Sequence, residues 1–295
     1  MRDFCITTDS NSDLPKEYID KLGTVIIPQY YSFGDTVYGD ELNMPPVEFY
    51  EKMKSGELPQ SQANNPAVIE EKFRAVLDKG MDIIHIAFSS ALSSSYNNVC
   101  MVAADLSEEY KDAKITVIDT TIVSLGESIL VLRANELKEQ GASYEEIVEA
   151  IEAMKLHINA WFVVDDLFHL QRGGRVSKTT AMVGSVLNLK PFLFVNKAGA
   201  LTSAGTTRGR KRSVQGMLDR MKQSLDENVD YTLPVGIVHA NALEDAKMMA
   251  EKVKEETGFK TVIINDISPS IGTHTGPGAL GLMFYGAVRP EAEKM

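Results

Sequence analysis

The chain has few of the cysteines and none of the long apolar runs that mark disulfide-rich, metal-binding and membrane-spanning proteins. It contains two cysteines among 295 residues, Cys5 and Cys100, and both stand in apolar segments. Two buried free thiols fit this pattern better than a disulfide, and no Cys/His spacing suggests a metal site. No run approaches about 18 uninterrupted apolar residues, and the first residues lack a signal-peptide pattern. We therefore expect a cytoplasmic protein without a membrane span, a metal or a cofactor.

An excess of positive charge is also missing. Asp and Glu number 41 against 30 Lys and Arg, so the formal net charge is −11. This balance disfavours nucleic acids and anionic membranes as main partners, although it is compatible with a small anion in a local pocket. The hydrophobic content of 44% is typical of a globular protein. A chain of this length has room for two domains.

Apolar runs alternate with amphipathic helical patterns through the first half. The runs at 3–8, 82–88 and 114–119 predict parallel strands, so we expect an α/β domain over residues 1–156 with helices on both faces of its sheet. The second half, residues 157–295, mixes a hairpin around Gly199 with strand–helix pairs. The predicted fold class is therefore α/β with two domains, of which the C-terminal one is a mixed α+β domain.

Five serines crowd the turn that follows the predicted strand at 82–88. They are Ser89, Ser90, Ser93, Ser94 and Ser95. Hydroxyls and unpaired N–H groups at the start of a helix attract anions. A plain N-cap needs only one serine, and the stretch alone leaves both interpretations open.

Two further segments carry polar groups without strong charge. Ser61, Gln62, Asn64 and Asn65, in a segment that we predict to be a loop between two helices, offer neutral hydrogen-bond donors, which a buried carboxylate needs in the absence of an ion pair. His274 stands between two threonines in a glycine-rich segment, which we predict to be a loop.

The motifs of common enzyme classes are missing or out of context. The chain has no P-loop and no G-x-S-x-G elbow. The G-x-G-x-x-G spacing of Gly276, Gly278 and Gly281 lacks the helix and second strand that a dinucleotide site requires. Two basic runs, at 172–175 and 208–212, are either solvated helix ends or a docking patch for a phosphate-bearing or acidic partner.

Several motifs, in order along the whole chain, resemble those of the DegV family of bacterial fatty-acid-binding proteins. They are TTDSNSDLP, LPQSQANNP, SSALSSSYNN, VIDTTIVSLGESILV, RGGR, LKP, RGRKR and IGTHTGPGALG. The resemblance implies a two-domain protein that encloses one long-chain fatty acid of C16–C18 type, such as palmitate or oleate. It also implies a carrier rather than an enzyme, which presents the acid to an ATP-binding fatty-acid kinase for acyl-phosphate formation in phospholipid metabolism.

The resemblance also implies roles for individual residues. Ser61 and Ser93 would bind the carboxylate, with Ser94 and Ser95 shaping the turn. His274, Thr273 and Arg172 would belong to the surrounding hydrogen-bond network. Arg208, Arg210 and Lys211 would contact the kinase. The family's Gly-Thr after the key serine is Ser94-Ser95 in this chain, which bears on loop shape and acyl-chain preference.

Two points stay open at this stage. An alternative function is a serine-dependent lipid hydrolase or acyltransferase that uses Ser93 and His274. The residues that line the acyl tail are not fixed by sequence, and the candidates are Met182, Val183, Val186, Leu187, Phe192 and Phe194.

Overall fold

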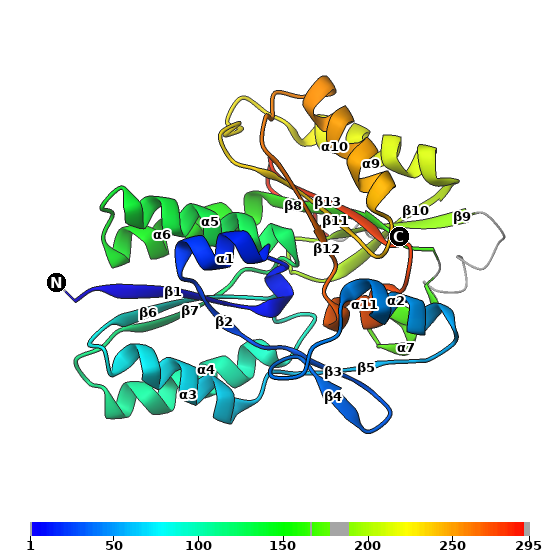
Figure 1. Cartoon of the computed structure of the whole chain (residues 1–295). Helices are drawn as coiled ribbons and strands as arrows, with labels where there is room; N and C mark the ends of the chain where they lie inside the picture. Colours follow the sequence, from blue (N-terminus) through cyan, green and yellow to red (C-terminus); the bar gives the residue numbers. More distant parts are fainter. Residues whose placement is uncertain (1, 166, 178–188, 292–295) are drawn as a thin grey trace.

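The computed structural model describes residues 2–165, 167–177 and 189–291 and is built on two main sheets (Figure 1). The first is four-stranded and parallel, in the order β2-β1-β6-β7. Its strands are β1 (Phe4–Asp9), β2 (Val25–Ile27), β6 (Asp82–Ala87) and β7 (Ile115–Asp119). Every residue of β6 is buried, as its continuous apolar run predicts for a central parallel strand.

Helices cover both faces of this sheet, as predicted (Figure 1). One face packs against α3 (Pro66–Leu77) and α4 (Ser95–Glu109) through Phe73, Val99 and Leu106. The other face packs against α5 (Leu125–Glu139) and α6 (Tyr144–Met154), with α1 (Lys16–Leu22) beside them.

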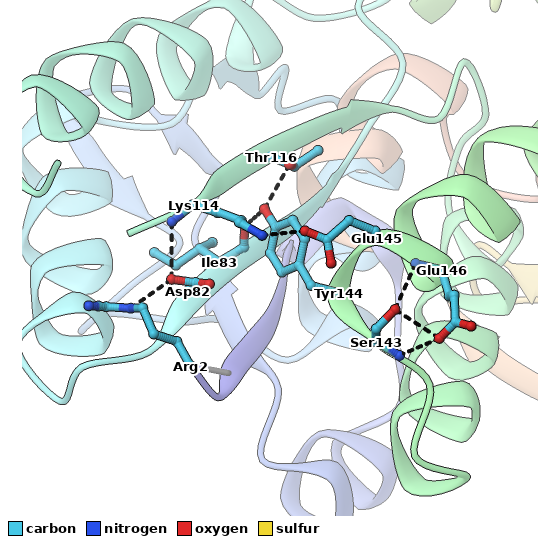
Figure 2. A network of polar contacts seen from close by, with 9 residues as sticks. All are labelled: Arg2, Asp82, Ile83, Lys114, Thr116, Ser143, Tyr144, Glu145 and Glu146. Carbon is cyan, nitrogen blue, oxygen red and sulfur yellow. Dashed lines mark hydrogen bonds and ion pairs between the residues drawn. The ribbon is translucent and has the colours of Figure 1, made fainter. Parts of the chain in front are cut away.

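A polar network fixes α6 on the sheet (Figure 2). The Tyr144 hydroxyl donates to the Ile83 carbonyl at 2.9 Å and lies 2.7 Å from Thr116 Oγ1. Ser143 and Glu146 form the predicted capping box at the start of this helix. The network therefore ties the first turn of α6 to both β6 and β7.

The second main sheet has six strands in the order β10-β9-β8-β13-β11-β12. Only β11 and β12 pair in parallel among its neighbours, so the sheet is mixed, as expected. The helices α9 (Arg210–Ser224) and α10 (Leu243–Glu256) cover one face (Figure 1). The strands are β8 (Ile158–Val163), β9 (Leu189–Val195), β10 (Leu201–Arg208), β11 (Val235–His239), β12 (Val262–Asp266) and β13 (Leu280–Tyr285). The predicted hairpin around Gly199 is confirmed as β9–β10.

A small antiparallel sheet, which the sequence did not predict, adjoins the first one. It has the order β4-β3-β5 and consists of β3 (Tyr30–Phe33), β4 (Thr36–Tyr38) and β5 (Gln60–Gln62). The segment predicted as a loop before Asn64 therefore contains a strand. Against this sheet lie α2 (Pro46–Lys54) and α11 (Pro269–Thr275), and α11 also contacts α7 (Phe168–Arg172). The loop predicted around His274 is thus wrong, because His274 lies in helix α11.

The two halves share one hydrophobic core. Strand pairing changes at η2 (Lys155–His157), next to the predicted boundary, yet α5 packs on β1 and β6 and also on β8, β11 and β13. One buried cluster runs from Phe4 and Ile84 to Phe162 and Met283. The domain boundary between residues 156 and 157 remains a prediction. Two domains divided there would pack directly against each other through this shared core. No helix in the described ranges is long and apolar enough to cross a membrane.

Candidate functional site

A cavity of about 250 Å³ is lined by residues from both halves of the chain. Its polar lining includes Ser61 from β5, Ser93 and Ser94 from the turn before α4, and His274 from α11, together with Arg175. The serine turn meets the β5 segment, because Asn64 N–H donates to Ser95 Oγ at 3.3 Å. The apolar lining comprises Ala63, Phe88, Leu92, Val123, Phe162, Leu170, Leu201, Val238, Ile267, Ile271, Ala279, Leu280 and Met283.

Ser61 and His274 form the best-defined pair of this cavity. Ser61 Oγ lies 2.7 Å from His274 Nε2. Burial lowers the pKa of His274 to about 3, and the positive charges of Arg175 and Arg172 act in the same direction, so the imidazole is neutral at physiological pH. A neutral imidazole can donate to Ser61 through Nε2, which leaves the Ser61 hydroxyl free to donate to a ligand.

Close packing holds the His274 ring in place. A Cβ atom on Gly173 would lie 2.0 Å from His274 Nδ1, so only glycine fits at this position. The buried Nδ1 has no hydrogen-bond partner among the described residues. Without a carboxylate to orient it, the ring is not arranged like the base of a catalytic triad.

The five serines have separate roles in the structure. Ser94 is the N-cap residue of α4 but makes no side-chain capping bond, whereas Ser93 Oγ accepts from the Ser95 N–H at 3.2 Å. Ser95 is buried and does not line the cavity. Ser89 donates to the Gly199 carbonyl, and Ser90 donates to Asp119. The turn is therefore more than a plain side-chain N-cap, and Ser93 and Ser94 face the cavity.

The sequence missed Arg175, although it lies in the RGGR segment. Its guanidinium donates to the Leu92 carbonyl from Nε at 3.0 Å and from Nη2 at 2.8 Å, and it lines the cavity. No acidic side chain in the described part of the chain forms an ion pair with it. Its positive charge is thus available to an anion in the cavity.

The other predicted network residues lie behind the cavity lining. Arg172 donates from Nη2 to the Thr273 carbonyl at 3.2 Å, and Thr273 Oγ1 donates to the Pro269 carbonyl at 2.9 Å. Neither Arg172 nor Thr273 lines the cavity. Both therefore support helix α11, which carries His274.

Three buried carboxyl groups lie close to the same region. Asp9 accepts from the N–H groups of Asn11 and Phe88, both at 2.9 Å, and burial raises its pKa to about 6. Burial likewise raises the pKa of Asp13 to about 7. It also raises the pKa of Glu127 well above its usual value, an effect that the charges of Asp9 and Asp13 enlarge.

Asp13 connects the first half of the chain to α11. It accepts from the Ser268 N–H at 3.0 Å and from the Ser124 hydroxyl. Ser268 precedes α11 and Ser124 lines the cavity. A change in the charge of Asp13 therefore alters a hydrogen bond at the start of α11 and another at the cavity wall.

The two predicted tail-lining residues that the structure describes do not line the cavity. Phe192 and Phe194 pack against Trp161 in a different buried cluster. The other four candidates, Met182, Val183, Val186 and Leu187, lie outside the described residues.

The predicted docking residues differ in their availability. Arg210 forms an ion pair with Asp245 at 2.8 Å and donates to the Gly278 carbonyl at 2.6 Å, so it holds the start of α9 in place. Arg208 and Lys211 are exposed. Arg210 is therefore a structural residue in this fold, and the other two remain candidates for a partner.

Ser93 and His274, the pair required by the alternative function of a lipid hydrolase or acyltransferase, do not form a hydrogen bond with each other. His274 bonds to Ser61, whereas Ser93 Oγ bonds to Ser95. The described residues contain no group of three His, Cys, Asp or Glu side chains that could hold a metal ion.

Comparison with known proteins gives one consistent family. A family model described as an uncharacterised protein of the DegV family matches residues 3–287. A DegV domain-containing protein of Clostridium perfringens is 36% identical over 288 residues, which cover 97% of this chain and 98% of that protein.

Solved structures show the same fold. A fatty-acid-binding DegV family protein from Thermus thermophilus has a TM-score of 0.86 and 27% identity, with 97% of this chain and all of that chain covered. DegV, a fatty acid binding protein from Bacillus subtilis, has a TM-score of 0.82 and 28% identity over 97% of this chain and 100% of its own. A stearic-acid-binding protein from Eubacterium ventriosum has a TM-score of 0.86 and 25% identity, with 95% and 98% covered.

Proposed function

The chain belongs to the DegV family, and on that premise we propose that it binds one long-chain fatty acid in the cavity described above. The observation that carries the proposal is the composition of the cavity wall. Hydroxyls, a neutral imidazole and one guanidinium without an acidic partner among the described residues lie beside a wall of aliphatic and aromatic side chains. An amphipathic anion with a long apolar tail is the ligand that matches both parts.

The energetics of this binding favour an acid with a long tail. Each buried methylene contributes about 0.8 kcal/mol, so a sixteen-carbon chain offers on the order of 10 kcal/mol. Hydrogen bonds to a charged group contribute about 1.5–3 kcal/mol each, which offsets part of the cost of removing the carboxylate from water. The tail supplies affinity, while Ser61, Ser93 and Arg175 orient the carboxylate.

We further propose that the protein is a carrier, which presents the bound carboxylate to a kinase that forms an acyl phosphate. Ser93 and Ser94 lie at the positive end of the α4 dipole, and Arg175 adds a full charge. Such a site suits both a carboxylate and the more highly charged acyl phosphate.

Lipid analysis tests the binding function directly. The purified protein is extracted with organic solvent, and the extract is analysed by mass spectrometry before and after incubation with palmitate or oleate. We expect one fatty acid per chain. A protein that carries none and takes up neither acid would disprove the proposal.

A second experiment tests the partner. A fatty-acid kinase and ATP are added to the protein loaded with palmitate, and acyl phosphate is trapped with hydroxylamine. We expect the Arg208→Glu, Lys211→Glu double variant to lower the rate about tenfold without loss of bound lipid, because basic surface residues steer docking. Glu substitutions at Lys16 and Lys21, both exposed on α1, provide the control. No acyl phosphate from the wild type would contradict the carrier role but leave fatty-acid binding standing.

A further inference from the structure

A chain of hydrogen bonds leads from Ser93 through the buried Ser95 to Gln29, which also lines the cavity. Ser93 Oγ donates to Ser95 Oγ at 2.8 Å, and Ser95 Oγ donates to Gln29 Oε1 at 2.7 Å. Ser95 and Gln29 are 2% and 3% exposed, so water does not compete for these bonds. In this direction the proton of Ser93 points toward Ser95, and Ser93 offers a bound anion only its lone pairs.

A bound carboxylate requires the opposite direction, because it accepts hydrogen bonds and cannot donate them. If Ser93 turns its proton toward the ligand, Ser95 has to donate to Ser93. Gln29 then has to donate to Ser95. The Gln29 amide can exchange acceptor for donor by a half-turn about its last bond, since its oxygen and nitrogen ends have nearly the same shape.

The surroundings of Gln29 permit this rotation at low cost. The buried Nε2 atom has no hydrogen-bond partner within 3.5 Å in the described ranges, so the half-turn breaks the Ser95 bond, remakes it with reversed polarity, and gives up the weaker contact through which Gln29 lowers the pKa of Asp9. The backbone stays fixed, because the Gln29 N–H donates to Ser10 Oγ at 2.9 Å.

The rotated amide turns Oε1 toward the neighbouring Asp9 carboxyl. Burial raises the pKa of Asp9 to about 6, and Gln29 is among the groups that oppose this rise. A protonated Asp9 can face an amide oxygen without repulsion.

We propose that Gln29 is a positioning residue of the carboxylate site, which sets the direction of the Ser95–Ser93 chain and reverses it when a fatty acid binds. This inference rests on the proposed function. The reversal makes binding of a fatty acid depend on Gln29, whereas binding of a fatty alcohol does not. The alcohol can donate its own proton to Ser93, so it binds with the Ser95–Ser93 hydrogen bond in either direction. A carboxylate is accepted only after the reversal.

Two substitutions at position 29 have opposite predictions. In Gln29→Glu, assayed at a pH high enough to ionise this buried carboxyl, the carboxylate accepts from Ser95 and cannot donate, which holds the chain in its ligand-free direction. We expect palmitate binding to weaken about tenfold or more, with 1-hexadecanol changed by less than about threefold. In Gln29→Met, or Gln29→Leu if the first folds poorly, Ser95 is free to donate to Ser93. Palmitate binding then stays within about threefold of the wild type.

A double-mutant cycle separates hydrogen-bond direction from charge repulsion. We expect the effect of Gln29→Glu on palmitate to disappear in a Ser95→Ala background, where the chain is interrupted. Gln60→Glu on exposed β5 is the control for an added charge near the site. Titration calorimetry with palmitate and 1-hexadecanol gives the affinities, and circular dichroism checks folding.

The outcomes distinguish this inference from the proposed function. Weakening by Gln29→Met that equals weakening by Gln29→Glu would show that Gln29 only supports the turn, and it would overturn the inference. Persistence of the Gln29→Glu effect in the Ser95→Ala background would overturn it as well, because repulsion alone explains that result. Both outcomes leave fatty-acid binding intact. Failure of the wild type to bind palmitate would instead disprove the function itself.

Discussion

The Ser61 hydroxyl shows how much of the site depends on single side chains. Its one hydrogen-bond partner within the described residues is His274 Nε2, 213 positions further along the chain. The sequence indicated both residues as candidates, because each stands in a segment of neutral polar residues outside the apolar runs that predict the core. Their pairing could not be predicted, since it depends on α11 packing against β5.

Removal of either cavity hydroxyl tests the carboxylate site at the residue scale. We expect Ser61→Ala and Ser93→Ala each to weaken palmitate binding about tenfold to a hundredfold, because each removes one hydrogen bond to a charged group. Titration of delipidated protein measures the effect. Ser107→Ala is the matched control, since that hydroxyl bonds to the Ala103 carbonyl within α4. Affinities unchanged in both variants would show that neither serine contacts the carboxylate.

Two other residues show where sequence reasoning at this scale ends. Arg172 and Arg175 flank the same Gly-Gly pair, and only the path of the chain decides that Arg175 lines the cavity. Gln29 stands in an apolar run after Pro28, so nothing in its neighbours marks it as part of a polar chain. Its role depends on a contact with Ser95, 66 positions away.

At the scale of the element, α11 owes its structure to its neighbours. Its sequence PSIGTHT contains glycine and two β-branched threonines, which are weak helix formers, and this is why a loop was predicted. The helix is anchored from outside, because Tyr50 donates to the Ile267 carbonyl at 2.8 Å and Ser268 N–H donates to Asp13. Strand β5 is similar, since its partner β3 lies 30 residues earlier. By contrast, the long apolar runs and capped helices were predictable because their signals are local.

The packing of α11 against α2 gives a prediction for this element. A Cβ atom on Gly272 would lie 2.4 Å from the Tyr50 hydroxyl, so Gly272→Ala has to displace α11 or the ring. We expect a loss of about 1–3 kcal/mol in the free energy of unfolding, with weaker palmitate binding. Chemical denaturation measures the first quantity.

A second helical glycine supplies the control for that experiment. At Gly216 in α9 a Cβ atom would meet only ordinary contacts at 3.8 Å, and alanine favours a helix by about 0.5–1 kcal/mol. Gly216→Ala should therefore be neutral or stabilising. Equal effects of the two substitutions would contradict the proposed crowding at Tyr50.

At the scale of the whole molecule, buried ionisable groups change stability in opposite directions as the pH rises from about 3 to 7. The pKa values of Asp9 and Asp13 rise from 3.8 to about 6 and about 7 on folding. Their stabilising contribution is complete below pH 3.8 and is lost as the pH rises through 6 to 7. Burial lowers the pKa of His85 from 6.5 to about 3, so its contribution is present above pH 6.5 and is lost as the pH falls.

The contribution of Asp13 to this profile can be tested by one substitution. Between about pH 4 and 7 we expect Asp13 to lower the melting temperature of the wild type as the pH rises, because it ionises without a cationic partner in the described structure. Asp13→Asn should fall less steeply, since the amide does not ionise. Asp35→Asn, in an exposed turn, should keep the wild-type slope. Parallel slopes for all three proteins would exclude Asp13 as a cause.

The position of β13 in its sheet determines when the protein can fold during synthesis. This strand, Leu280–Tyr285, lies between β8 and β11, although both are made earlier. Until residue 285 has left the ribosome, β8 and β11 lack the neighbour that joins them, and the face of α5 that packs on them has no cover. The N-terminal half therefore waits with an exposed apolar helix face while the rest is translated. We expect chaperone binding to nascent chains to last until this strand emerges.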